Sequence, residues 1–248
     1  MAQAMPQGPG PGLRLEPGDS VGAVVVAAGG SSRMGGVDKI FATICGSPVV
    51  GFALDQFEAF PPVTEIVLVL DSSAVEKGRA FVLQRGYRKA IHVCAGGERR
   101  QDSVRRGLEP LHSCRWVIVH DGARPCLDLP MLQRGLDAAA ESGAAVAGVP
   151  VKDTIKVVSQ QGVVTDTPDR EGLWAAQTPQ VFRYDLLWDA HQRCKETVTD
   201  DAMMVERLGH TVRMFTGSYE NIKVTTPEDL ILAEAFLSSR AGRMAKSP

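Results

Sequence analysis

The sequence predicts an α/β fold in which a mostly parallel β-sheet carries helices on both faces. Its apolar runs are nearly unbroken, whereas a strand that faces water on one side alternates apolar and polar residues. Helical patterns fill the gaps between successive runs, and this alternation is typical of a doubly wound sheet. Ligands of such sheets bind beyond the carboxyl ends of the strands, so the informative residues should follow the apolar runs.

Five apolar runs supply the predicted strands. The first and third end in glycine pairs, while the second and fourth lead into an aspartate, and both residue types favour turns. The predicted strands are Val21–Ala28, Ile66–Leu70, Ile91–Ala95, Trp116–Val119 and Ala144–Val151.

Helix signals lie between and after these runs. Residues Pro48–Phe60 place apolar side chains at helical spacing, and Asp128 is the expected N-cap of a helix that Gly143 stops. Thr199 is expected to cap a shorter helix. The clearest start is Thr226–Asp229, which offers a cap, a proline at the first helical position and acidic groups against the helix dipole.

One segment breaks the alternation of strand and helix. Two short β-rich runs, Thr154–Val158 and Val163–Thr167, flank a Gln-Gln-Gly turn and predict a hairpin. The residues alone leave two interpretations open: a simple surface hairpin, or an arm that packs on a partner.

The chain ends and the composition exclude several classes of protein. Residues 1–20 hold eight Gly or Pro and predict a disordered leader, and residues 239–248 predict a loose tail. The leader lacks the apolar stretch of a secretory signal, and no apolar run reaches about 18 residues, so we expect a cytoplasmic protein without a membrane span. A net charge of -2 argues against a strongly basic nucleic-acid surface. Five cysteines without C-x-x-C spacing predict free thiols.

The first predicted strand leads into a glycine loop that carries Arg33 and Lys39. Glycines let backbone N–H groups approach phosphate, and two cations six residues apart suit a triphosphate. The spacing matches neither a P-loop nor G-x-G-x-x-G, which counts against an NAD-dependent oxidoreductase. The alternative is a plain strand-to-helix turn with solvated charges.

Three further segments also lie beside strand ends. Gly96–Val104 joins a glycine pair to a polar helix start, which suits base or ribose contacts. Asp121 ends a strand, where an acidic group can orient ribose, phosphate or a metal ion, while Arg124 can hold an anion and His120 alternates away into a structural role. Lys223 precedes a helix N-terminus, and both features favour an anion. A cap, a salt bridge and a solvated lysine are the respective alternatives.

Together these segments resemble the 2-C-methyl-D-erythritol 4-phosphate cytidylyltransferases of the non-mevalonate isoprenoid pathway. The resemblance runs from about Val24 to Phe236. It rests on A-A-G-x-x-x-R-M and H-D-x-A-R-P, on D-R-x-G-L-W-x-x-Q-T-P-Q at Asp169–Gln180, and on N-I-K-V-T-x-P-E-D-L before the last helix. The family implies a Rossmann-like nucleotidyltransferase fold, a homodimer, and Mg²⁺ held mainly by the CTP phosphates rather than by a protein metal site.

The resemblance also implies a role for each matched residue. Arg33 and Lys39 would neutralise charge on the CTP phosphates, joined in catalysis by Lys223 and Arg170. The domain would be single, spanning 21–238, with the hairpin as a dimer arm at about 152–176 that reaches the neighbouring active site. The cytidine pocket would contain Ala27, Ala28, Gly29, Gly97, Ser103, Asp121 and Gly122. The methylerythritol phosphate would meet Asp121, Arg124, Thr178, Thr199 and Lys223, with Thr154 and Arg170 entering from the partner's arm.

Two residues depart from the family pattern. Asp38 stands where proline is frequent, which predicts a more mobile and less positive loop before Lys39. Gly122 stands where alanine is frequent, a change expected to leave backbone contacts intact.

The implied reaction is attack by a phosphate oxygen of methylerythritol phosphate on the α-phosphorus of CTP. A phosphate monoester has a second pKa near 6 and is mostly dianionic at neutral pH, so no general base is needed. Catalysis then depends on positioning and on neutralising charge. Two alternatives stay open: a pentitol-phosphate cytidylyltransferase such as one acting on ribitol 5-phosphate, and a catalytically silent nucleotide-binding protein.

Overall fold

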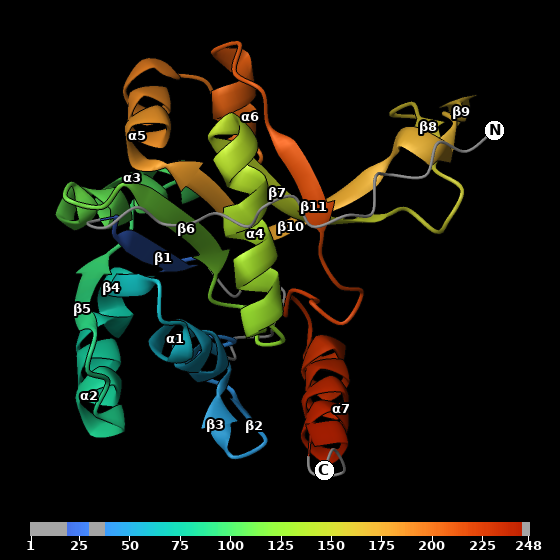
Figure 1. Cartoon of the computed structure of the whole chain (residues 1–248). Coiled ribbons are helices and arrows are strands. Elements are labelled where there is room, and N and C mark those ends of the chain that lie inside the picture. The colour runs from blue at the N-terminus through green and yellow to red at the C-terminus, as the bar shows by residue number, and fades with distance from the viewer. Residues whose placement is uncertain (1–18, 30–37, 245–248) are drawn as a thin grey trace.

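A seven-stranded sheet forms the centre of the computed structural model, which describes residues 19–29 and 38–244 (Figure 1). The strand order is β11-β7-β10-β6-β1-β4-β5. Within this sheet β10 (Trp174–Arg183) runs antiparallel to both of its neighbours, and the other pairings are parallel. The prediction of an α/β fold with a mostly parallel sheet is confirmed.

The five predicted strands are present with shifted ends. They are β1 (Val21–Ala27), β4 (Val63–Leu70), β5 (Ala90–Ala95), β6 (Trp116–Asp121) and β7 (Ala144–Pro150). Two further strands, β10 and the edge strand β11 (Arg213–Thr216), were not predicted from the sequence. Strand β10 does not form an apolar run because it contains the polar residues Gln177, Thr178 and Gln180, although all three are buried in the sheet.

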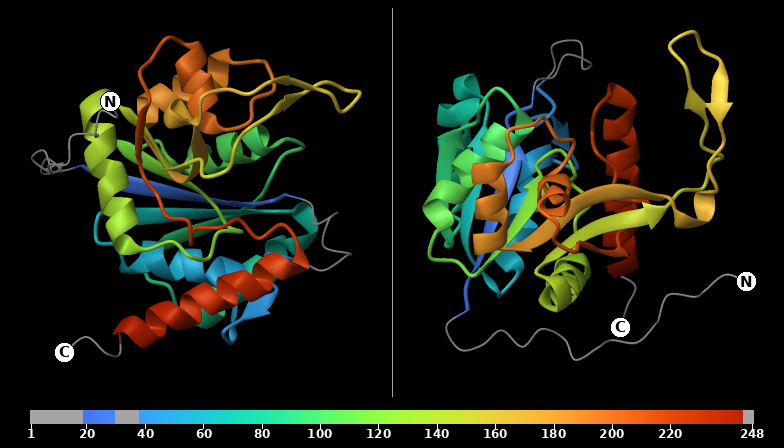
Figure 2. Two further views of the ribbon diagram at one scale, coloured as in Figure 1. Left: turned by 90° about the vertical axis from the view of Figure 1, so that its right-hand side faces the viewer. Right: turned by 90° about the horizontal axis from the view of Figure 1, so that it is seen from above.

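Helices cover both faces of the sheet (Figure 2). The side chains of Ala23 and Val25 point into one core layer and those of Val24 and Val26 into the other, so β1 is buried on both sides. The first layer holds α1 (Val49–Ala59), α2 (Val75–Arg85), α4 (Leu129–Ser142) and α7 (Pro227–Met244). The second holds α3 (Arg100–Leu108), α5 (Tyr184–Arg193) and α6 (Asp201–Arg207).

Several short elements complete the described fold. They are β2 (Thr43–Ile44), β3 (Ser47–Pro48), β8 (Val157–Val158), β9 (Val164–Asp166) and the 3₁₀ turns η2 (Ser72–Ala74), η3 (Glu109–Leu111) and η4 (Arg170–Gly172).

One predicted helix cap is confirmed, one is wrong by a residue, and the helix start predicted at Thr226–Asp229 is correct because α7 begins at Pro227. The Asp128 side chain accepts a hydrogen bond of 2.8 Å from the Met131 amide and caps α4. At the start of α7, the Asp229 carboxylate accepts one of 2.8 Å from the Thr226 amide. The Thr199 cap is wrong by one residue, because the carboxylate of Asp200 takes that place at α6.

The C-terminal helix is longer than the sequence predicts. Helix α7 continues to Met244, so the loose tail predicted from residue 239 is wrong for 239–244, while 245–248 lie outside the described residues. Arg240 explains the extension, because its guanidinium donates to the Glu220 carboxylate at 2.8 Å and to the Cys126 carbonyl at 2.7 Å. Of the predicted leader, only residues 19 and 20 are described, and Asp19 pairs with Arg115 at 2.9 Å.

The predicted hairpin projects from the body of the molecule as a two-stranded extension (Figures 1 and 2). Its strands β8 and β9 are shorter than the predicted runs. We call residues 152–173 the arm. Its exposed apolar side chains are Ile155, Val157, Val158, Val163 and Val164.

The five cysteines are free thiols, as predicted. Across residues 19–29 and 38–244, no helix combines the length and apolar character needed to cross a membrane.

Candidate active site

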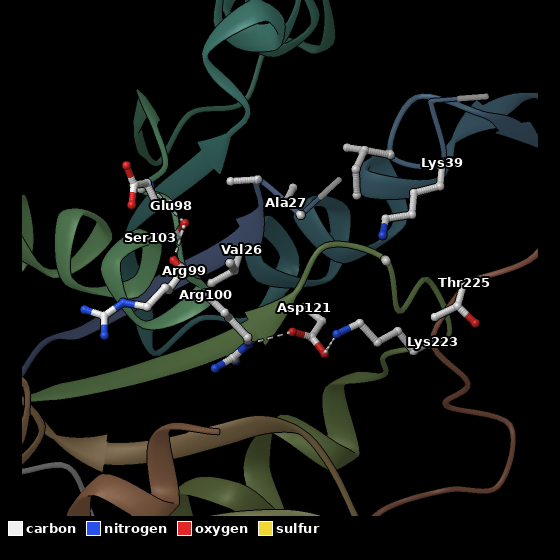
Figure 3. Close-up of a pocket in the computed structure, with 15 residues that line it drawn as sticks. Val26, Ala27, Lys39, Glu98, Arg99, Arg100, Ser103, Asp121, Lys223 and Thr225 are labelled. Carbon is white, nitrogen blue, oxygen red and sulfur yellow. Dashed lines mark hydrogen bonds and ion pairs between the residues drawn. The ribbon is translucent and has the colours of Figure 1, made fainter. Parts of the chain in front are cut away.

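The largest concentration of predicted site residues lines a pocket of about 290 Å³ at the carboxyl ends of β1, β5 and β6 (Figure 3). Strand β1 lies between β4 and β6, where the direction of strand succession reverses, and this switch point is the usual ligand site of an open α/β sheet. We call this pocket of about 290 Å³ the first pocket. It is lined by Val26, Ala27, Ala28, Gly29, Lys39, Ile40, Gly97, Glu98, Arg99, Arg100, Ser103, Asp121, Ala123, Lys223 and Thr225.

Two glycines let the loop after β5 pack against the start of α3. A Cβ atom added at Gly96 would lie 2.3 Å from the Ala28 Cβ, and one at Gly97 would lie 2.4 Å from the Asp102 Cβ. The Ser103 hydroxyl oxygen accepts a hydrogen bond of 3.1 Å from the Gly97 amide. Any side chain at either glycine would therefore push this wall of the pocket out of place.

The opposite wall carries a lysine. In Figure 3 the amine of Lys39 points into the pocket, and a Cβ added at Gly29 would lie 4.0 Å from that nitrogen. Asp38 accepts hydrogen bonds from the Ile40 amide at 3.1 Å and from the Lys77 amine at 3.2 Å. Asp38 thus orders the turn that carries Lys39, while the mobility predicted for the preceding loop falls on residues outside the described ones.

Asp121 is surrounded by three cations at the end of β6. Its carboxylate lies 3.0 Å from the Lys223 amine and 3.3 Å from the guanidinium groups of both Arg100 and Arg124. Burial by itself would raise the pKa of Asp121, but attraction to Arg100, Lys223 and Arg124 outweighs burial and lowers that pKa. The carboxylate therefore stays ionised and holds the three cations beside the pocket.

Arg100 links this carboxylate to a second buried one. Its guanidinium also contacts the Asp201 carboxylate at 2.6 Å, at the first residue of α6. Burial would lower the pKa of Arg100, but the charges of Asp201 and Asp121 raise it, so the side chain stays charged. Because α3 begins directly after the loop that contains Gly96 and Gly97, Arg100 connects that loop to the α5–α6 region.

A second pocket, of about 230 Å³, adjoins the first. The two share Arg100, Asp121 and Lys223, so one charged wall separates them. The second pocket is lined by Arg100, Asp121, Arg124, Ala176, Gln177, Thr178, Gln180, Thr199, Asp200 and Lys223.

The structure brings most predicted site residues to these two pockets. The predicted residues that line the first pocket are Ala27, Ala28, Gly29, Lys39, Gly97, Ser103, Asp121 and Lys223. Those that line the second are Arg124, Thr178 and Thr199, together with Asp121 and Lys223, which line both.

Three predicted residues that the structure describes line neither pocket. Thr154 and Arg170 lie on the arm, where the Arg170 guanidinium donates to the Lys152 carbonyl at 2.8 Å. Gly122 packs inward against β1. Arg33 lies outside the described residues.

Several lining residues were not predicted, above all Arg100. It stands in the segment Gly96–Val104, and the rule that ligands meet strand ends applies to it as much as to Lys223. Gln180 and Asp200 were missed as site residues as well, and they are joined by a hydrogen bond of 2.8 Å. Their signal was weak, because β10 was not recognised as a strand.

The described residues fit no resident metal ion. They hold no cluster of three or more His, Cys, Asp or Glu side chains with the spacing of a metal site. Both carboxylate oxygens of Asp121 are already engaged by cations.

The fold and the pockets together define a class of protein. A doubly wound sheet with glycine-bordered, cation-lined pockets at its switch point is typical of α/β enzymes that bind a nucleotide and transfer a phosphate-linked group.

Comparison with known proteins narrows this class to one family. The IspD family model, described as 2-C-methyl-D-erythritol 4-phosphate cytidylyltransferase, matches residues 21–239. A protein of that name from Dehalococcoides mccartyi is 50% identical over 219 residues, covering 88% of this chain and 96% of the relative. One from Pelotomaculum thermopropionicum is 46% identical over 235 residues, covering 92% and 99%.

Solved structures agree with this assignment. The 4-diphosphocytidyl-2C-methyl-D-erythritol synthase of Anaerococcus prevotii superimposes with a TM-score of 0.79 at 28% identity, covering 89% of this chain and 99% of the other. The cytidylyltransferase of Thermus thermophilus gives a TM-score of 0.72 at 32% identity, covering 88% and 99%. The chain belongs to the IspD family of 2-C-methyl-D-erythritol 4-phosphate cytidylyltransferases.

Proposed function

We propose that this chain transfers the cytidylyl group of CTP to 2-C-methyl-D-erythritol 4-phosphate, giving 4-diphosphocytidyl-2-C-methyl-D-erythritol and pyrophosphate. Family membership supports the reaction. The observation that carries it in this chain is the pair of adjoining pockets that share the wall of Arg100, Asp121 and Lys223. A reaction between a nucleoside triphosphate and a sugar phosphate needs two anion sites that meet at one point.

In the proposed reaction, a phosphate oxygen of the acceptor attacks the α-phosphorus of CTP. A new oxygen–phosphorus bond forms while the bond from the α-phosphorus to the bridging oxygen breaks, and pyrophosphate leaves with that electron pair. The acceptor phosphate is already deprotonated at neutral pH, so no residue has to take a proton from it.

Charge repulsion between the two substrates is the main obstacle to this reaction. Lys39 and Lys223 point into the first pocket, where they would face the triphosphate (Figure 3). Arg33 belongs to the same proposal through the family motif. Mg²⁺ would enter bound to the CTP phosphates as part of the substrate and reduce their charge further.

The loop after β5, which contains Gly96 and Gly97, suits the cytidine. Gly97 and Ser103 bring backbone groups and a hydroxyl to a wall too tight for added side chains. Polar groups left unpaired by another base would penalise that base. The second pocket would then take the acceptor, where Arg124, Thr178 and Thr199, which line this pocket, would face the polyol.

The arm is proposed to complete the neighbouring site of a homodimer. Two features support this: the arm exposes apolar side chains, and Thr154 and Arg170 line neither pocket of their own chain. Arg170 would add positive charge near the acceptor phosphate of the partner. Homodimeric assembly and a cytoplasmic location stay predictions from the sequence.

The ribitol 5-phosphate alternative is not favoured, because the relatives reported above carry the methylerythritol name. A direct assay decides between the two. Purified protein with Mg²⁺ and CTP is given either sugar phosphate, and pyrophosphate release is followed, with UTP in place of CTP as the base control. Release with methylerythritol phosphate and CTP is expected. Preference for ribitol 5-phosphate, or no release with either acceptor, would refute the proposal.

A further inference from the structure

A buried histidine lies directly behind the charged wall. His120, on β6 next to Asp121, has no exposed surface, and its ring packs edge-on against Phe57 at a centroid distance of 5.9 Å. Its Nδ1 lies 3.1 Å from the Thr178 hydroxyl, and its Nε2 lies 3.1 Å from the Arg124 carbonyl oxygen. Each ring nitrogen thus has one partner, and each partner lies beside the second pocket.

The partners of the ring determine where its proton resides. A carbonyl oxygen only accepts, so the Nε2 that faces Arg124 must carry a hydrogen. The Asp121 amide donates to the Thr178 hydroxyl oxygen at 3.0 Å, which leaves the hydroxyl its own hydrogen to donate elsewhere. In an uncharged ring Nδ1 is then a bare acceptor, and the Thr178 hydroxyl donates to it.

The surroundings of His120 keep the ring uncharged. Burial lowers the pKa of His120 to about 4, against the raising effects of the Arg124 carbonyl and the Asp121 charge. The charges of Arg124 and Lys223 contribute to this lowering, and Phe57, which packs on the ring from α1, carries no charge. At neutral pH the ring therefore serves as one donor and one acceptor.

These hydrogen bonds form a closed network around the turn after β6. They run from the Asp121 amide through Thr178 and His120 to the Arg124 carbonyl, and the Arg124 amide donates back to the Asp121 carbonyl at 3.0 Å. Both ends of the turn are held. The turn therefore fixes the Asp121 carboxylate at the shared wall and the Arg124 guanidinium beside it in the second pocket.

We propose that His120 is a positioning residue of the transferase site, in the tautomer with its proton on Nε2. Its Nδ1 accepts a hydrogen bond from the Thr178 hydroxyl. Thr178 can then accept a hydrogen bond from the polyol acceptor but cannot donate one. The part that concerns the acceptor rests on the proposed function, whereas the tautomer does not. The fixed tautomer leaves Nδ1 as the acceptor that orients the Thr178 hydroxyl.

Nitrogen-15 NMR of the whole protein tests the tautomer. A long-range proton–nitrogen spectrum is recorded from pH 5.5 to 8.5, and the His120 signals are assigned by their loss in His120→Gln or by contacts with the Phe57 ring. We expect one tautomer, protonated on Nε2, at every pH. A proton on Nδ1, or a change of charge within this range, would overturn the proposal whether or not the enzyme accepts methylerythritol phosphate.

Kinetics of two Thr178 variants test the second part. Thr178→Val removes the hydroxyl at constant shape, and we expect kcat/KM for the acceptor to fall about tenfold, the order of one neutral hydrogen bond, with KM for CTP within about twofold. It should also shift the His120 nitrogen signals. Thr178→Ser restores the hydroxyl and should recover most of the loss. An unchanged spectrum in Thr178→Val, or an equal loss for both substrates, would contradict a positioning role. A wild-type enzyme without activity would instead refute the proposed function alone.

Discussion

The pocket end of the body buries charged side chains, whereas the arm exposes apolar ones. At the pocket end, Asp121 and Asp201 are buried, and each is held by an arginine of its own chain. On the arm, Val158 and Val164 remain half exposed, and β8 and β9 pair with each other. The charged wall is therefore assembled by one chain, whereas the arm presents apolar surface that folding of that chain does not bury.

The largest expected effect comes from removing the link between the two buried carboxylates. Arg100→Met leaves Asp121 and Asp201 without their shared partner, and breaking a buried ion pair costs about 3–5 kcal/mol of unfolding free energy. Urea denaturation measures this cost. Arg105→Met, an exposed arginine of the same helix, is the matched control and should change stability by about 0.5 kcal/mol or less. Equal effects of the two changes would show that the wall is not preorganised by Arg100.

The next effect is on rate rather than on stability. Lys39→Ala removes a cation that points into the first pocket, and we expect kcat to fall by about 10²–10³, the usual cost of one donor to a transition state. The same loss is expected for Arg33→Ala. Steady-state kinetics measure it, with circular dichroism to verify the fold and the exposed Lys195→Ala as control. Normal turnover in Lys39→Ala would remove it from the catalytic set.

A smaller effect is expected where the sequence departs from its family. A Cβ added at Gly122 would lie 2.9 Å from the Ala27 Cβ, so alanine there overpacks the end of β1. We expect Gly122→Ala to cost about 1–3 kcal/mol of unfolding free energy. Gly172→Ala on the arm meets no atom within 4 Å and is the control. Thermal denaturation that fails to separate the two variants would contradict this account.

The smallest effect on the single chain is expected on the arm. Val158→Ser changes a side chain that is 50% exposed, so the stability of the chain should move by about 0.5 kcal/mol or less. The proposed dimer should nevertheless weaken, because burying an apolar side chain stabilises an interface. Sedimentation at several concentrations measures this, with Leu83→Ser, 83% exposed on α2, as the control. Identical association of the two variants would count against the arm as an interface.

The part of the site that the sequence could predict is the part made by local chain order. Lys39 follows β1, Asp121 ends β6 and Lys223 precedes α7, and the rule that strand ends carry ligands places them together. Arg100 also follows a strand end, but its link to Asp201, a residue 101 positions away, could not be predicted because only the folded sheet brings the two together.

The fold itself was predictable where one signal dominated. Strand β1 is apolar throughout and was recognised, whereas β10 carries buried glutamines that are satisfied by distant partners such as Ser218 and Asp200. The end of α7 was missed for a similar reason: Arg240 anchors it to Glu220 and Cys126, and a Ser-Ser-Arg-Ala-Gly sequence gives no sign of that.

Mixing two inactive variants tests most directly whether body and arm work in different subunits. In a heterodimer of Lys39→Ala and Arg170→Ala chains, one site would combine an intact body with an intact arm, and the other would carry both defects. Random exchange of equal amounts should therefore restore about a quarter of wild-type activity, since half of the dimers are mixed and half of their sites are intact. No recovery, with subunit exchange verified by mass spectrometry, would contradict an arm that completes the partner's site.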